Sequence, residues 1–232
     1  MKLEVTYPWP GDTAAARRLQ EELAALVSAR PGLPATVHRV AGIDISPPDA
    51  DGWVRGAVVV LRWPGMEVEE VSIGRARPPV PYVPGLLGFR EAPAAADALE
   101  RLSAVPDAIL VDGQGYAHPR RFGLACHIGL MTGLPTVGCA KSVLLGKHGP
   151  LGSERGDWTP MVDRGETVGA VVRTRQNVSP VYVSVGHRVD LESAIALVLG
   201  CCGRYRLPEP TRMAHHAAAG TLGEPDAATA SS

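Results

Sequence analysis

The sequence predicts a single α/β domain built on a mixed β-sheet with helices on both faces, and two observations lead to this prediction. Three extended segments, at residues 37–46, 55–63 and 66–73, follow one another with only short turns rich in Pro, Asp and Gly between them, as in an antiparallel meander. Beyond about residue 93, helical and extended patterns alternate, which is typical of parallel strands joined by helices. We therefore expect three antiparallel strands followed by parallel strands.

An amphipathic helix is expected before the first strand, because apolar residues recur there at helical spacing. This apolar stripe consists of Leu19, Leu23, Leu26 and Val27. Asp12 or Thr13 is suited to cap the helix, and the Pro31-Gly32 pair is expected to end it. We assign this helix a packing role only.

The elements after the meander follow a Pro-rich loop at residues 77–85. A helix is expected from about Pro93, a favoured first-turn residue, to Leu102. Further helices are expected at residues 122–132 and 190–199, and strands at 108–111, 135–139, 167–173 and 181–184. Residues 217–232 are small and polar and are expected to be disordered, which leaves residues 1–216 as one catalytic domain.

The charge balance limits the kind of partner. The chain has 23 Lys and Arg residues against 24 Asp and Glu residues, a net charge of -1, whereas a sequence-independent nucleic-acid binder is usually strongly basic. Contact with nucleic acid must then be local, through the basic segments at 118–121 and 141–148, unless these segments are ordinary solvated faces.

Neither a membrane span nor a secretory leader is expected. No stretch approaches the roughly 18 apolar residues that a span requires, and residues 1–13 contain no apolar core of a signal peptide. The four cysteines have no zinc-binding spacing, so we interpret them as reduced packing residues. Without a span or a leader, we expect a cytoplasmic protein. We expect it to be a monomer, because no exposed heptad or apolar stripe is left without a partner element.

Three carboxylates are candidates for a cation site. Strand alternation places Asp44 beside Gly42, on the face opposite Ile43. Asp112 follows a buried strand, where ligands of α/β sheets bind, and Glu91 lies near the start of a helix. Carboxylate oxygens are preferred by Mg²⁺. The alternatives remain open, because Asp before Gly also begins turns and Glu near a helix start is stabilised by the helix dipole.

A set of motifs in order and spacing resembles the endonuclease V family over residues 13–216. These motifs are Ala41-Gly-Ile-Asp-Ile-Ser46, Pro81-Tyr-Val-Pro-Gly-Leu-Leu-Gly-Phe-Arg-Glu91, Asp112-Gly-Gln-Gly115, His118-Pro-Arg-Arg-Phe-Gly-Leu-Ala125, Gly138-Cys-Ala-Lys-Ser142, Gly186-His-Arg-Val189 and Tyr205-Arg-Leu-Pro-Glu-Pro-Thr-Arg212. The second and the last of these motifs are the most specific. The resemblance implies a ribonuclease H-like fold, in agreement with the strand order expected above.

The resemblance also implies an activity, a DNA repair endonuclease that cuts the second phosphodiester bond 3′ to deoxyinosine in single- or double-stranded DNA. It leaves 3′-hydroxyl and 5′-phosphate ends, and the deaminated base stays in place. Asp44, Glu91 and Asp112 would bind two Mg²⁺ ions, which Mn²⁺ can replace, and His215 would lie near them. Inosine-containing RNA is an alternative substrate.

Further site residues are implied by the same resemblance. His118 and Lys141 would contact phosphate or the developing charge, and Tyr82 would act as a wedge beside the lesion unless it is a packed aromatic residue. Substrate contacts are expected from Tyr82, Arg90, Gly85, Gly113 and Gly138, with glycine backbone reading an extruded base.

The chain departs from the family pattern at three positions. Pro47 stands where an aromatic residue is common, Gln114 where His is frequent, and Cys126 at a usual Ser position. Two other functions stay open, a structure-specific nuclease of the same fold and a binding module without activity. Intact Asp44, Glu91 and Asp112 argue against the second.

Overall fold

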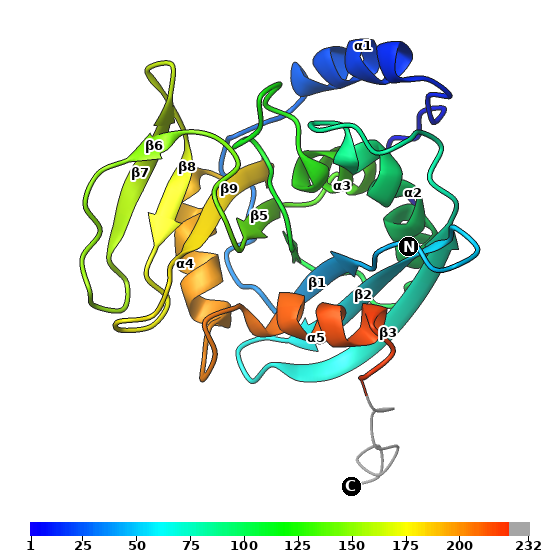
Figure 1. The fold of residues 1–232 in the computed structure, drawn as a ribbon. Coiled ribbons are helices and arrows are strands. Elements are labelled where there is room, and N and C mark those ends of the chain that lie inside the picture. Colours follow the sequence, from blue (N-terminus) through cyan, green and yellow to red (C-terminus); the bar gives the residue numbers. More distant parts are fainter. Residues whose placement is uncertain (223–232) are drawn as a thin grey trace, which may run out of the picture.

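A computed structural model describes residues 1–222 of the protein (Figure 1). A nine-stranded mixed sheet organises it. The strands are β1 (Arg39–Ile45), β2 (Val54–Arg62), β3 (Glu67–Ala76), β4 (Ala108–Val111), β5 (Thr136–Ala140), β6 (Lys147–His148), β7 (Trp158–Asp163), β8 (Glu166–Val172) and β9 (Val181–His187). Their order in the sheet is β3-β2-β1-β4-β5-β9-β8-β7-β6. The α/β class and the antiparallel meander β1–β2–β3 are as predicted.

The second half of the sheet differs from the prediction. Strands β4 and β5 run parallel to β1, but β9 pairs antiparallel with β5, and β8, β7 and β6 continue antiparallel. A parallel pair needs a long crossover, usually a helix, and none lies between β7, β8 and β9. Arg164 and Gly165 both have positive φ, at 54° and 81°, the combination that a two-residue hairpin turn requires.

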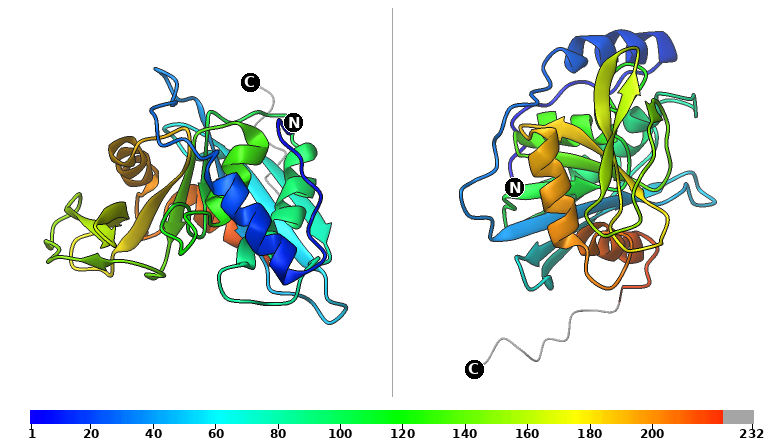
Figure 2. Two further views of the ribbon diagram at one scale, coloured as in Figure 1. Left: turned by 90° about the horizontal axis from the view of Figure 1, so that it is seen from above. Right: turned by 90° about the vertical axis from the view of Figure 1, so that its left-hand side faces the viewer.

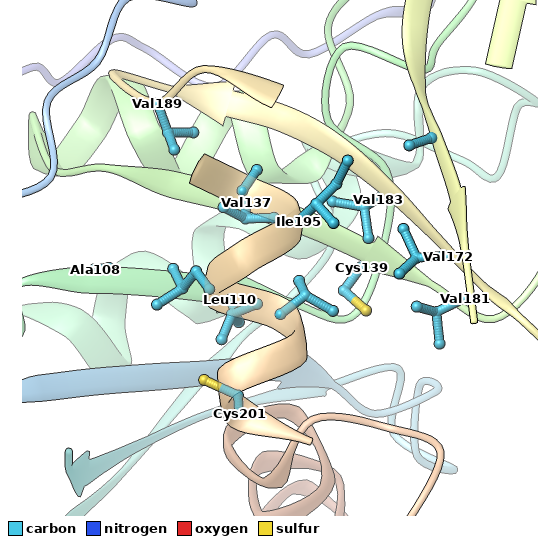
Figure 3. Packing of buried hydrophobic residues seen from close by; sticks show 14 of the residues in the cluster. Ala108, Leu110, Val137, Cys139, Val172, Val181, Val183, Val189, Ile195 and Cys201 are labelled. Atoms are coloured by element: carbon cyan, nitrogen blue, oxygen red, sulfur yellow. The ribbon is translucent and has the colours of Figure 1, made fainter. Parts of the chain in front are cut away.

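Helices cover both faces of the sheet, as expected (Figures 1 and 2). They are α1 (Thr13–Ala24), α2 (Leu87–Glu100), α3 (Leu124–Thr132), α4 (Leu191–Cys201) and α5 (Glu209–Ala218). Helices α2 and α3 pack on the face that buries Ala41 and Ile43, and α4 packs on the opposite face. Figure 3 shows the hydrophobic core between α4 and the sheet, where Ile195 of α4 lies among branched side chains such as Val137 and Val183.

Two predicted helix boundaries were wrong. Helix α1 ends at Ala24, seven residues before Pro31, and Leu26 of the expected stripe is 59% exposed. Helix α2 starts at Leu87, so that Pro93 lies inside it and not in its first turn. The turn before Pro93 is held by tertiary packing, because Phe89 is fully buried in a cluster with residues of α1.

Helix α5 and the strands β6 and β7 were not predicted. The first turn of α5 contains Pro210, and its last residues, Ala217 and Ala218, are buried against β2. These two residues belong to the segment that we expected to be disordered; positions 223–232 of that segment lie outside the described residues. Within residues 1–222, no helix has both the length and the apolar character needed to cross a membrane.

Candidate active site

Asp44 lies near the end of β1, on the side of the strand that faces α5. The predicted alternation is confirmed, because Ala41 and Ile43 are buried on the opposite face. Helix α5 touches the strand backbone at Gly42, where an added Cβ would lie only 1.9 Å from the carbonyl oxygen of Pro210. Only glycine permits so close an approach, and this approach places α5 over Asp44.

Asp112 comes to the same end of the sheet because β4 is the parallel neighbour of β1. Ile43 is paired with Val111, and the backbone N–H of Asp112 donates to the carbonyl of Ile43 at 2.9 Å. One ligand atom each from Asp44, Asp112 and His215 lies within 4.8 Å of the others. His215 Nδ1 is 2.7 Å from Asp44 Oδ2. Two carboxylates and an imidazole at this spacing suit a divalent cation.

Glu91 of α2, the third carboxylate predicted to bind the cation, does not belong to this group of three, although the charges of Asp44 and Asp112 act on it. Burial, together with the charges of Asp44 and Asp112, raises the pKa of Glu91 to about 8, while Arg90 opposes the shift. The pKa of Asp112 is also raised, chiefly by burial, although its ion pair with Lys141 acts in the opposite direction. The mutual repulsion of these carboxylates is what a bound cation would relieve.

His118 and Lys141 lie beside this cluster and make different contacts. Lys141 Nζ forms an ion pair with Asp112. Burial, with Arg120 nearby, lowers the pKa of His118 to about 4, so its ring is neutral at pH 7. Because His118 Nδ1 accepts the N–H of Arg120 at 3.2 Å, the proton of the neutral ring lies on Nε2. His118 is therefore a hydrogen-bond donor there and not a cation.

A pocket of about 220 Å³ opens next to the carboxylates. Its walls include Tyr82, Gly85, Glu91, Asp112, Gly113, Gln114, His118 and Leu124. The side chain of Tyr82 is 67% exposed, which contradicts the alternative of a packed aromatic residue. Gly85 has a φ of +80°, which L residues other than glycine rarely adopt.

Two predicted substrate contacts do not line this pocket. Gly138 is buried in β5, where an added Cβ would lie 2.6 Å from the backbone nitrogen of Gly115, so strand packing explains this glycine. Arg90 donates from Nη1 to the carbonyl of Val80 at 2.9 Å and lines a neighbouring groove. Gly113 and Gly85, by contrast, are in the wall.

The structure shows the contacts of the three residues that depart from the family pattern, Pro47, Gln114 and Cys126. Gln114 Nε2 donates to the carbonyl of Ser142 at 3.0 Å, and Pro47 lies in the groove that also contains Arg90. Cys126 is fully buried, and burial raises the pKa of its thiol to about 12, as expected of a packing residue without reactivity. The four cysteines are unpaired, as predicted.

Sequence reasoning missed the helix that carries His215 and the role of Gln20. The signals for α5 were present, since Pro210 lies in its first turn after the acidic Glu209, and two histidines occupy its last turn. Gln20 is a polar residue within the apolar face of α1, is 1% exposed, and bonds to the carbonyl of Gly85 in the pocket wall.

The fold and this centre define a class, an α/β protein with an acidic cluster at the carboxyl ends of neighbouring strands that can hold a divalent cation beside a pocket. The family model described as Endonuclease V matches residues 21–216. The chain belongs to the endonuclease V family, and it is accordingly a nuclease, which is a hydrolase.

Relatives and solved structures agree. An endonuclease V of Roseiflexus castenholzii is 50% identical over 214 residues, 92% of this chain and 95% of that protein. The structure of a Streptomyces avermitilis endonuclease V aligns with a TM-score of 0.88 at 41% identity, covering 96% and 98% of the two chains. A Ciona intestinalis endonuclease V, solved in complex with DNA containing an inosine followed by a ribo-adenosine, aligns at 0.77 and 27% identity, covering 90% and 96%.

Proposed function

We propose that this nuclease acts in DNA repair and hydrolyses the second phosphodiester bond 3′ to deoxyinosine. The products are a 3′-hydroxyl and a 5′-phosphate, and the deaminated base stays in the strand. The observation that supports this best is the cluster of Asp44, Asp112 and His215 next to a pocket with an exposed Tyr82 at its wall. The inosine-containing DNA bound to the Ciona relative supports the choice of substrate.

Asp44, Asp112 and Glu91 are the proposed ligands of Mg²⁺, with Mn²⁺ as a substitute. When bound, two such ions would supply charge stabilisation for the attacking and leaving oxygens of an in-line displacement. His215 holds the Asp44 carboxylate in place through its 2.7 Å hydrogen bond, and the ion pair with Lys141 does the same for Asp112. A side chain of α5 and one just after β5 thus set the geometry of these two carboxylates.

His118 and Tyr82 act on the substrate and not on the cation. The Nε2–H of neutral His118, which faces the backbone of Gly85 in the protein without substrate, donates a hydrogen bond to a phosphate oxygen when substrate binds, and this needs no change of protonation near neutral pH. Tyr82 fills the space left by the displaced base, as an exposed aromatic ring at a pocket wall can do. The extruded base then meets the backbone of Gly85 and Gly113.

The test is strand nicking of a labelled duplex that carries one deoxyinosine, compared with the same duplex carrying adenine. We expect one product, cut at the second bond 3′ to inosine, with Mg²⁺ but not with EDTA, and no product from Asp44→Ala. The exposed Asp51, on the loop that follows the same strand, provides the matched control Asp51→Ala, which should cut like the wild type. Absence of cation-dependent cutting at inosine in the wild type would contradict the proposal.

Inosine-containing RNA is the second candidate substrate, because the Ciona relative was solved with a ribo-adenosine after the inosine. Duplexes with a ribose or a deoxyribose 3′ to inosine should be compared in the same assay. Faster cutting of the ribose substrate by tenfold or more would favour a ribonuclease. A flap or mismatch duplex cut as fast as inosine would favour a structure-specific nuclease.

A further inference from the structure

The amide of Gln20 lies between two loops of the pocket, one that carries Tyr82 and one that carries His118. Gln20 belongs to α1 and is 1% exposed. Its Nε2 donates to the carbonyl of Phe122 at 2.7 Å and to the carbonyl of Gly85 at 3.1 Å. Burying an amide without partners is unfavourable, so a buried glutamine with both ends bonded fixes the groups that it contacts.

Arg120 completes the connection. Its Nε donates to Gln20 Oε1, and its Nη2 donates to the carbonyl of Gly85 at 2.7 Å. Its backbone N–H donates to His118 Nδ1 at 3.2 Å. The carbonyl of Gly85 therefore receives hydrogen bonds from both Gln20 and Arg120, and the same arginine fixes the ring of His118.

Apolar packing places Gln20 at this junction. Ala16, one turn earlier in α1, packs with Val80 and Leu86 on either side of the Tyr82 loop. Leu23, one turn later, packs with Phe122 after the His118 loop. Helix α1 therefore spans both loops, with the one polar residue of its buried face between them.

We propose that Gln20 is a positioning residue that joins the Tyr82 loop to the His118 loop and so sets the width of the pocket that receives the base. This proposal rests on the proposed function for its substrate, but the connection between the loops is independent of it. None of the proposed cation ligands contacts Gln20 through a hydrogen bond within the described residues. Loss of the amide should therefore weaken substrate binding while the cation requirement stays unchanged.

The variant Gln20→Met keeps the volume of the side chain and removes its three hydrogen bonds. With a neutral hydrogen bond contributing roughly fivefold to an equilibrium constant, we expect KM for the inosine duplex to rise about tenfold. We expect kcat and the Mg²⁺ concentration for half-maximal rate to stay within about twofold of wild type. The control is Leu23→Ala, which removes buried apolar contacts of the same helix but no hydrogen bond of this junction.

Hydrogen exchange measures the connection without substrate or cation. In Gln20→Met, the amides of residues 80–88 and 117–122 should exchange about tenfold faster, and together. Leu23→Ala removes a packing contact of Phe122 and should therefore raise exchange at 117–122 alone, leaving 80–88 near wild-type rates. Should Gln20→Met not fold, Gln20→Glu removes both N–H donors and keeps the acceptor toward Arg120. Unchanged exchange in both segments, or an equal rise of KM in Leu23→Ala, would overturn the proposal; wild-type protein inactive on inosine would instead overturn the proposed function.

Discussion

Removal of the buried imidazole of His127 should change how the stability of the protein depends on pH. His127 lies in α3, is fully buried, and its ring packs edge-on against Phe89 and Phe122. Its Nδ1 is hydrogen-bonded to the hydroxyl of Tyr7 at 2.7 Å, and its Nε2 has no partner within the described residues. Burial lowers its pKa to about 3. The perturbation is His127→Leu, which places an apolar side chain there.

The magnitude follows from proton linkage. The unfolded chain protonates this imidazole below its ordinary pKa of about 6.5, and the folded chain does so only near pH 3. The unfolded state therefore binds more protons between these values, so the free energy of unfolding falls as pH falls. At about 1.36 kcal/mol per pH unit, the wild type loses about 2 kcal/mol through His127 between pH 7 and pH 5. His127→Leu lacks this loss.

Urea unfolding of both proteins near pH 7 and near pH 5 measures the difference. Tyr7→Phe is the matched control, because it removes the hydrogen bond but keeps the imidazole and should keep the wild-type dependence on pH. Other buried histidines, such as His118 and His187, are present in all variants and cancel in the comparison. Equal pH dependence in wild type and His127→Leu would refute the conclusion that the ring is neutral in the folded protein.

Two further variants test the wedge role of Tyr82 and the close contact between α5 and β1 at Gly42. Tyr82→Ala should reduce the preference for inosine over adenine about tenfold, because loss of one aromatic stacking contact is worth about 1–3 kcal/mol. The Mg²⁺ requirement should change little. A variant that loses inosine preference and Mg²⁺ binding to the same extent would contradict the wedge assignment. Gly42→Ala should destabilise the fold by about 3 kcal/mol, because its Cβ would lie 1.9 Å from the carbonyl oxygen of Pro210. Thermal unfolding checks this against Gly203→Ala, whose Cβ meets no atom within 4 Å and which should unfold like the wild type.

The carboxylate pair could be predicted because its geometry follows from local rules. Alternation along a strand fixed the side of Asp44, and the carboxyl end of a buried strand fixed the place of Asp112. The two carboxylates meet only because β1 and β4 are parallel neighbours in the sheet. The sequence indicated this pairing only through the alternation of helices and strands. These inferences use spacings of a few residues, which a single sequence records well.

Other parts of the site depend on contacts that local spacing does not record. His215 is 171 residues away from Asp44, and their contact requires α5 to cross β1 at Gly42. Gln20 contacts Phe122 over a separation of 102 residues. The direction of β9 could not be predicted either, because β-forming residues show a similar pattern in parallel and antiparallel strands. The direction depends on which of the connections between strands contain a helix.

The two faces of the sheet contribute different parts of the proposed reaction. Helix α5 on one face holds Asp44 through His215, whereas α1, on the side of α2 and α3, holds the Tyr82 and His118 loops through Gln20 (Figure 2). Glu91 of α2 and Asp112 belong to both parts, since both are proposed cation ligands and both line the pocket. Changes in α5 should therefore act on cation binding and changes in α1 on the base, because no hydrogen bond among the described residues joins these two helices.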